Sequence, residues 1–105
     1  MAQGPSIDEL LAAARSEFAL RLPAKVGDLE AHAASDAWPD LRLAAHKLRG
    51  SAATYGFPAM SAIAASIEEL LLAAALAPAP AAVGRIRMAV TEARAEAERA
   101  CRESR

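Results

Sequence analysis

The chain has 105 residues, about the size of one domain, which allows a modest core but leaves no room for a nucleotide-binding domain as well. Hydrophobic residues make up 54% of it and aromatic residues only 4%, and the abundance of alanine favours helix. Twelve basic and thirteen acidic side chains leave a formal charge of -1, which gives no global attraction to nucleic acid or to an anionic membrane. A self-contained ATP-dependent kinase is therefore not expected.

Cysteine content and the start of the chain indicate a cytoplasmic setting. The single Cys101 cannot form an intramolecular disulfide, and Met1–Pro5 lacks the basic and apolar regions of a signal peptide. The longest apolar stretch, Leu70–Ala77, stops at Pro78 and is far shorter than the roughly 20 residues needed to cross a bilayer. We expect a reduced, cytoplasmic protein without a membrane segment.

A first helix is predicted over about residues 6–34. Ser6 and Glu9 have the spacing of a capping box, in which the hydroxyl and the carboxylate each accept a hydrogen bond from the other residue's backbone N–H. Pro23 removes a backbone donor and Gly27 lowers helix propensity, so this segment is either one bent helix or two. Its apolar stripe consists of Leu10, Leu11, Phe18, Leu22, Val26 and Leu29.

A second helix is predicted over about residues 37–55. Asp36 is a suitable N-cap, and Pro39 falls in the first turn, where its missing N–H costs nothing. Gly56 then ends the helix.

Two further helices are predicted over about residues 58–77 and 80–103. Pro58 opens the third, and its stripe is Met60, Ile63, Ile67, Leu70 and Ala74. The fourth has the stripe Val83, Ile86, Val90, Ala93 and Ala97. Short connections place successive helices antiparallel, so residues 1–105 are expected to form one all-α, up-down four-helix bundle with a kinked or broken first helix.

The second helix contains the most informative residues. On a wheel of about 100° per residue, its expected core face lies about 200° from His46. That face comprises Leu41, Ala44, Leu48, Ala52 and Tyr55. The wheel therefore directs His46 almost straight away from the bundle interior, into solvent.

The residues around His46 form a pattern that favours contact with a partner. A glycine in mid-helix costs about 1 kcal/mol relative to alanine, and Gly50, one turn after His46, leaves room for a bulky partner. The small side chain of Ala53 also leaves room on the next turn, and Leu43 offers an apolar contact on the same outward side. Positive charge that suits a phosphoryl group or an acidic partner comes from Arg42, Lys47 and Arg49.

Each of these features has an ordinary explanation, because exposed histidines, arginines and lysines are common on helix surfaces; it is their conjunction that favours function. His32 has no glycine or basic neighbours of this kind, and Cys101 has no second cysteine or nearby histidine in sequence. The sequence shows no metal-ligand cluster and no Gly-rich phosphate loop.

The run Ala45–Ala52, followed by Gly56 ten residues after His46, resembles the signature of histidine-phosphotransfer domains. Asp36–Trp38 upstream, and Ile67–Glu68 or Leu70 downstream, fit the same family, so the resemblance covers about residues 20–76. It implies an all-α four-helix bundle of two-component phosphorelays. His46 would be phosphorylated on Nε2 and Gly50 would make room for a receiver domain. Arg49 stands where the family usually has lysine, which keeps the charge but changes its geometry.

The expected function is the relay of a phosphoryl group between receiver-domain aspartates through His46, as an intermediate rather than a stand-alone enzyme. The partners would be receiver domains of a hybrid kinase or a response regulator, with no nucleic acid and no membrane. No cofactor is expected, because the receiver would bring the divalent metal. The chain is expected to be a monomer. Two alternatives stay open: a helical module that binds a receiver or another signalling protein without accepting phosphate, or an excised phosphoacceptor domain of a chemotaxis-type kinase.

Overall fold

The computed structural model describes residues 4–105, which form four helices and contain no strand. The helices are α1 (Ile7–Ala34), α2 (Trp38–Thr54), α3 (Pro58–Ala73) and α4 (Pro80–Glu103). The predicted all-α class is confirmed. Met1–Gln3, part of the segment expected to lack a signal peptide, lies outside the described residues.

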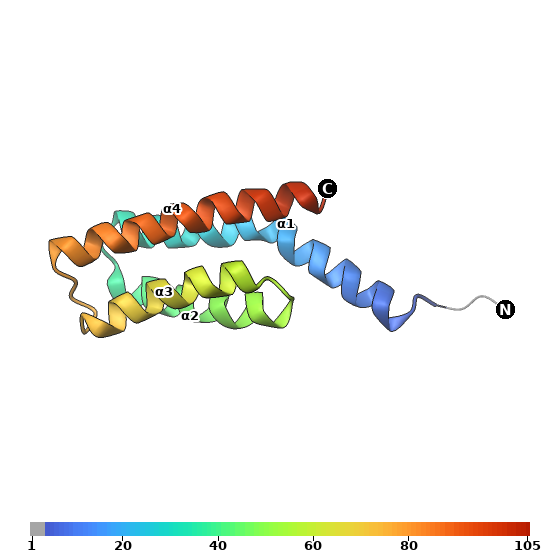
Figure 1. Cartoon of the computed structure of the whole chain (residues 1–105), viewed down its shortest axis with the longest axis horizontal. Coiled ribbons are helices and arrows are strands. Elements are labelled where there is room, and N and C mark those ends of the chain that lie inside the picture. The colour runs from blue at the N-terminus through green and yellow to red at the C-terminus, as the bar shows by residue number, and fades with distance from the viewer. Residues whose placement is uncertain (1–3) are drawn as a thin grey trace.

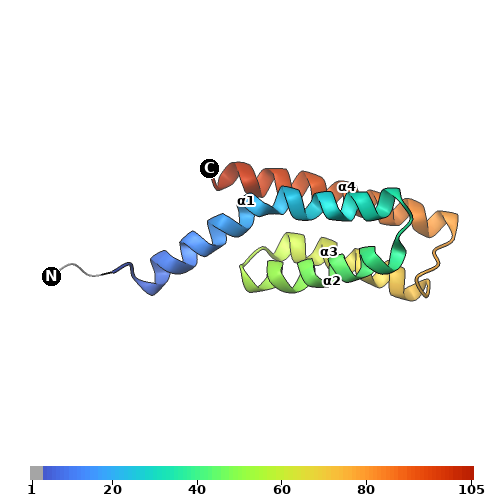
Figure 2. The same ribbon diagram turned by 180° about the vertical axis from the view of Figure 1, so that it is seen from behind.

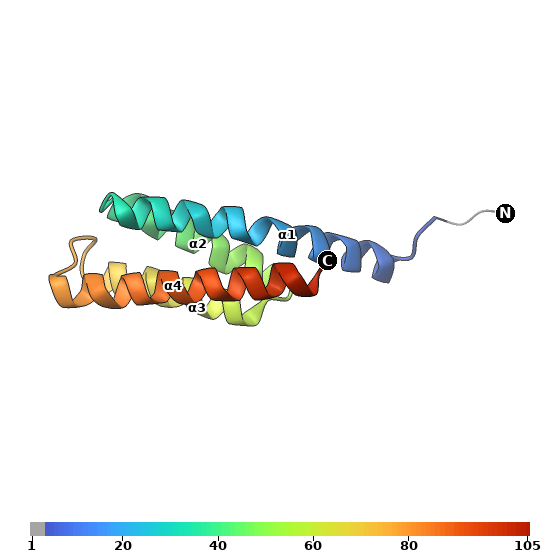
Figure 3. The same ribbon diagram turned by 90° about the horizontal axis from the view of Figure 1, so that it is seen from above.

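The helices run alternately up and down, and each packs against two others. In Figure 1 the α1 and α4 pair lies above the α2 and α3 pair, and Figure 2 shows the same layers from behind. Viewed from above in Figure 3, α1 and α2 lie on one side and α3 and α4 on the other. Contacts join α1 to α2 and α4, and α3 to the same two helices, so the order around the bundle follows the chain.

The first helix is continuous and bent. Ser6 Oγ accepts a hydrogen bond from the Glu9 backbone N–H at 3.1 Å, which is one of the two bonds of the predicted capping box. Pro23 lies inside this 28-residue helix. Its missing N–H leaves the carbonyl one turn earlier without a helical partner, which accounts for the change of direction of α1 in Figures 1 and 2. Of the two possibilities left open by the sequence, one bent helix is correct.

The N-terminal part of α1 projects beyond the rest of the bundle (Figure 1), which gives the molecule its extents of 63 × 22 × 19 Å. Leu10 and Leu11, expected to belong to the core stripe, are 54% and 63% exposed. Burial begins only at Phe18, where the turn between α2 and α3 first covers α1.

All three connections start with the same hydrogen-bonding turn, a Schellman motif, in which a residue with positive φ follows the helix. These residues are Asp36 (φ 55°), Gly56 (φ 82°) and Ala75 (φ 50°). After Gly56, for example, the Phe57 N–H donates to the Ala52 carbonyl at 2.7 Å. Gly56 therefore ends α2 as predicted.

Two predicted boundaries are wrong because of these turns. Asp36 is not an N-cap: it occupies the left-handed position after α1, and its carboxylate accepts a hydrogen bond from Arg87 at 3.1 Å. The third helix ends at Ala73 rather than Ala77, because Ala75 turns the chain out of the helix. No glycine marks either position.

The core is built from the inward faces of all four helices. Its largest fully buried side chains are Leu22, Val26, Leu29, Leu41, Met60, Ile67, Leu71 and Ile86. Alanines fill much of the rest, namely Ala19, Ala33, Ala45, Ala52, Ala64, Ala89, Ala93, Ala97 and Ala100. Tyr55, expected in the core, is 40% exposed and stacks on Phe18 at the rim, with ring centroids 4.8 Å apart.

We predict that Ala75→Gly stabilises the protein. Alanine at φ 50° carries left-handed strain that glycine avoids, a gain of about 0.5–1 kcal/mol after the greater freedom of glycine in the unfolded chain is subtracted. Ala73→Gly, two residues earlier at the end of α3, is the matched control and should destabilise by a similar amount. Urea unfolding measures both; a loss of stability in Ala75→Gly would contradict the assignment of the turn.

Candidate functional site

His46 lies at the middle of α2, with 61% of its side chain exposed. Its inner ring nitrogen, Nδ1, is 2.9 Å from Oε2 of Glu68 on α3. The imidazole therefore bridges the two helices at one nitrogen and meets solvent with the rest of the ring.

Glu68 is the only buried charged side chain among residues 4–105, with 5% of the residue exposed. Burying a carboxylate is costly unless donors surround it. Three groups do so: Arg42 Nη1 lies 3.4 Å from Oε2, Arg49 Nη1 lies 3.4 Å from Oε1, and His46 Nδ1 also approaches Oε2. Two arginines and one imidazole thus share a single carboxylate.

This contact determines which nitrogen of His46 is available for chemistry. An ionised carboxylate only accepts hydrogen bonds, so the proton of the neutral imidazole lies on Nδ1. The lone pair is then on Nε2, the nitrogen of the ring that Glu68 does not bind. The geometry presents a nucleophilic nitrogen to the exterior in a fixed ring orientation.

The inclination of His46 toward α3 differs from the helical-wheel expectation. The buried residues of α2 are Leu41, Ala45, Leu48 and Ala52. On a wheel of about 100° per residue, the mean direction of these four residues lies roughly 30° from the mean direction of the expected core face, on the side of Ala45. Ala44 is only partly buried. His46 consequently points outward and sideways, within reach of Glu68, rather than straight away from the core.

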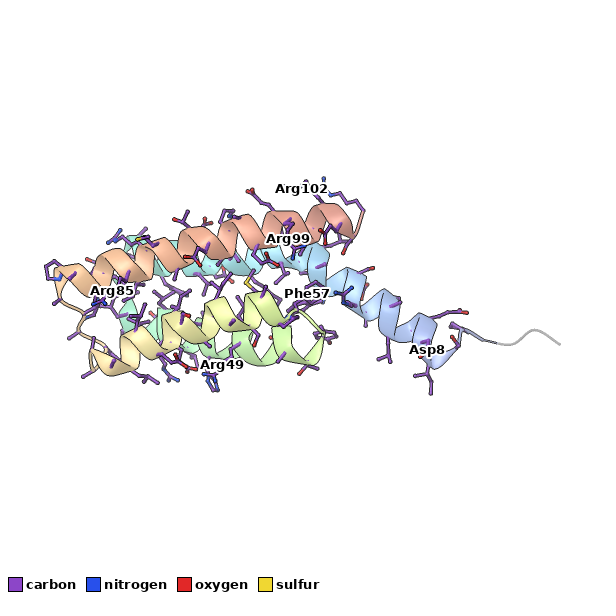
Figure 4. All side chains as sticks on the ribbon, in the orientation of Figure 1. Asp8, Arg49, Phe57, Arg85, Arg99 and Arg102 are labelled. Atoms are coloured by element: carbon purple, nitrogen blue, oxygen red, sulfur yellow. The ribbon has the colours of Figure 1, made fainter. Side chains whose placement is uncertain are left out.

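The basic residues around His46 divide into two groups. Arg42 and Arg49 lie on the α3 side, held by Glu68, and Arg49 also lies 4.0 Å from Glu69. Figure 4 shows Arg49 on the outer side of the α2 and α3 pair. Lys47 lies on the opposite flank, where it lines a shallow hollow between α1 and α2. The structure therefore does not bring the three predicted cations together around one point.

The small and apolar residues of the predicted site lie on the outer surface. A Cβ built on Gly50 would meet no atom within 4 Å, so this turn of α2 is open. Ala53 is exposed and lines an apolar groove between α2 and α3, together with Arg49, Gly56, Pro58, Ser61, Ala62 and Ala65. Leu43 is 44% exposed.

Sequence reasoning noted Glu68 only as part of a spacing and gave it no role. The available signal was a charged residue within the apolar stripe of α3, next to Ile67 and one turn after Ala64, both fully buried. Such a residue requires partners, and the facing helix supplies them.

Other polar groups take no part in this arrangement. His32 lies in the last turn of α1, and Cys101 is buried on α4. Ser51 donates a hydrogen bond to the Lys47 carbonyl at 2.6 Å. Within residues 4–105, no three His, Cys, Asp or Glu side chains are placed to hold a metal ion. Nor does any helix in that range combine the length and apolarity that a membrane crossing requires.

Residues 8–96 match the family model of the Hpt domain. The chain belongs to the Hpt domain family. No curated protein and no solved structure gave a significant match. Hpt domains serve phosphotransfer in two-component signalling and generally interact with receiver domains of kinases and regulators. The match includes both Glu68 and the whole of α2, so the described cluster lies inside the Hpt domain.

We predict that Glu68 determines the tautomer of His46. In the wild type, nitrogen chemical shifts should show neutral His46 with its proton on Nδ1, because Glu68 accepts that hydrogen bond. Glu68→Ala should give a mixture of tautomers, and Glu69→Ala, at the exposed neighbouring residue, should leave the wild-type pattern. Two-dimensional nitrogen–proton spectra measure this; a wild-type proton mainly on Nε2 would disprove the assignment.

Proposed function

We propose that this Hpt domain relays a phosphoryl group between receiver-domain aspartates through Nε2 of His46. The observation that carries the proposal is the hydrogen bond from Nδ1 to buried Glu68, which leaves Nε2 as the outward nucleophile. Its partners would be receiver domains of a hybrid histidine kinase or of a response regulator.

In the proposed step, Nε2 donates its lone pair to phosphorus of the aspartyl phosphate. The new N–P bond forms as the P–O bond to the aspartate breaks, and the carboxylate leaves with the electrons of that bond. The reverse reaction returns the phosphoryl group to a second receiver. Such transfers depend mainly on in-line positioning and charge stabilisation, and the receiver would supply the divalent metal.

Glu68 has a second role in this step. When Nε2 shares its lone pair with phosphorus, the ring gains positive charge while Nδ1 keeps its proton. The carboxylate 2.9 Å away stabilises that charge, as an acidic residue does behind the histidine of other nucleophilic sites. The same contact therefore holds the ring and assists transfer.

Arg42 and Arg49 provide the positive charge that a phosphoryl group on His46 needs. Their guanidinium groups contact Glu68 while 31% and 47% of their side chains stay exposed, so donors remain free for phosphate oxygens. Lys47, on the other flank, adds positive charge at the edge of the docking surface, by which we mean the exposed surface around His46 and Gly50 that a receiver would contact.

We predict that His46→Gln abolishes phosphoryl acceptance. Incubation with phosphorylated receiver domains carrying labelled phosphate should give acid-labile, base-stable label on the wild type and on His32→Gln, but none on His46→Gln. Label at equal levels on wild type and His46→Gln would exclude His46 as acceptor. Receiver binding without label on the wild type would instead indicate a module that only binds.

We predict that Gly50→Leu slows transfer while the fold is kept. The added side chain projects outward into open space and obstructs the receiver, so the rate should fall roughly tenfold or more, as when docking weakens by about 1.4 kcal/mol.

Gly84→Leu on α4 is the matched control, because a Cβ there also meets nothing within 4 Å. Both variants should gain up to about 1 kcal/mol in unfolding free energy from helix propensity. Equal transfer rates in the two variants, or unfolding of Gly50→Leu, would contradict the placement of Gly50 on the docking surface.

A further inference from the structure

The projecting part of α1 carries an apolar stripe that the bundle leaves uncovered. Ile7, Leu10 and Leu11 are 74%, 54% and 63% exposed. Ile7 and Leu11 lie two to three turns before buried Phe18 on the same face of the helix, and Leu10 lies beside them, about 80° from Phe18 around the helix. The face that α1 buries in the core thus continues into solvent. Figure 1 shows this segment clear of the other helices.

We propose that this stripe pairs with the same stripe of a second copy of the chain, antiparallel, to form a two-fold symmetric dimer. Charge on the segment supports this occupant. Asp8 and Arg15 are seven residues apart and so lie on one flank of the stripe. A two-fold axis across the helices brings this flank of one copy against the same flank of the other, which sets Asp8 opposite Arg15 twice.

The apolar residues fit the same register. When Leu11 of one copy faces Ala14 of the other, Ile7 faces the end of the partner's bundle near Phe18. A shallow hollow lies at that end, lined by Ala14, Phe18 and Tyr55, with Glu17 and Arg21 among its polar residues. Tyr55, 40% exposed, offers apolar surface to the incoming Ile7.

The opposite orientation is unfavourable. From Phe18 onward, the face of α1 that carries the stripe is covered by the chain's own bundle. In a parallel pair, the two bundles would lie at the same end of the paired helices and would compete for the same space. In an antiparallel pair, they lie at opposite ends. The antiparallel arrangement also leaves the outer surface of α2 and α3 free, because in Figure 4 Arg49 lies away from the projecting segment that bears Asp8.

Arg15 already contacts its own chain. Its Nη2 donates to the Gly56 carbonyl at 3.4 Å, and its guanidinium carbon lies 4.6 Å from the centre of the Phe57 ring. An arginine has five donors, so a carboxylate of a second copy can be bound as well. The contacts hold Arg15 in place at the end of the bundle.

The dimer is expected to be weak. Three turns of paired helix bury less than the roughly 1,200 Å² of surface that specific stable interfaces reach. Association should therefore appear as a rise of mass with concentration between micromolar and millimolar, in place of the monomer expected from the sequence.

Sedimentation equilibrium of the full chain tests the proposal. Wild type should approach twice the chain mass at the highest concentrations. Leu11→Ser should raise the dissociation constant roughly tenfold or more. Leu20→Ser, on the other side of α1 at 47% exposure, should leave it unchanged. A single-chain mass at every concentration, or equal effects of the two substitutions, would overturn the proposal.

A charge swap tests the orientation. Asp8→Arg and Arg15→Asp should each weaken the dimer, and the double variant should restore it, because the facing pairs are then reversed but still complementary. A double variant weaker than both single ones would exclude the antiparallel register. Circular dichroism confirms that each variant is folded, and phosphoryl acceptance by His46 is measured separately, since none of these residues contacts it.

Discussion

The buried carboxylate of Glu68 is the contact on which the candidate site depends. A charge in that position requires donors from a neighbouring helix, and α2 supplies all three of those observed. All three contacts cross from α2 to α3. The orientation of His46, the identity of its free nitrogen and the position of the two arginines therefore share one partner, Glu68.

Most of the fold could be predicted from sequence because its signals are local. The Ser6 cap, the prolines at the starts of α2, α3 and α4, and Gly56 after α2 each act within one turn of chain. The predictions that were wrong concern the start of the second helix and the end of the third, where the chain turns at Asp36 and Ala75 without a glycine. There the same local hydrogen bonds form as at Gly56, but an aspartate and an alanine adopt the left-handed conformation in place of the glycine that is its strongest residue-type signal.

The site was predictable in part for a different reason. Exposure and open space at His46 and Gly50 follow from the period of one helix, and the structure shows both. The contact between His46 and Glu68 depends on how α2 is rotated about its axis relative to α3. A helical wheel of α2 alone holds no information about that rotation. The grouping of Lys47 with Arg49 rested on their closeness to His46 in sequence, since the wheel itself sets the two about 160° apart. In the structure Lys47 lies beside α1 and Arg49 contacts Glu68 of α3.

The alanines of the core have a consequence for the chemistry at the surface. Helix axes approach more closely when small side chains meet between them, and α2 and α3 bury Ala45, Ala52 and Ala64. Across this interface Glu68 on α3 reaches the imidazole of His46 on α2. A larger side chain at one of these positions would act as a wedge, lengthening the bridge until the ring is free to rotate. The contact that orients the His46 ring is therefore linked to the volume of side chains buried in the core.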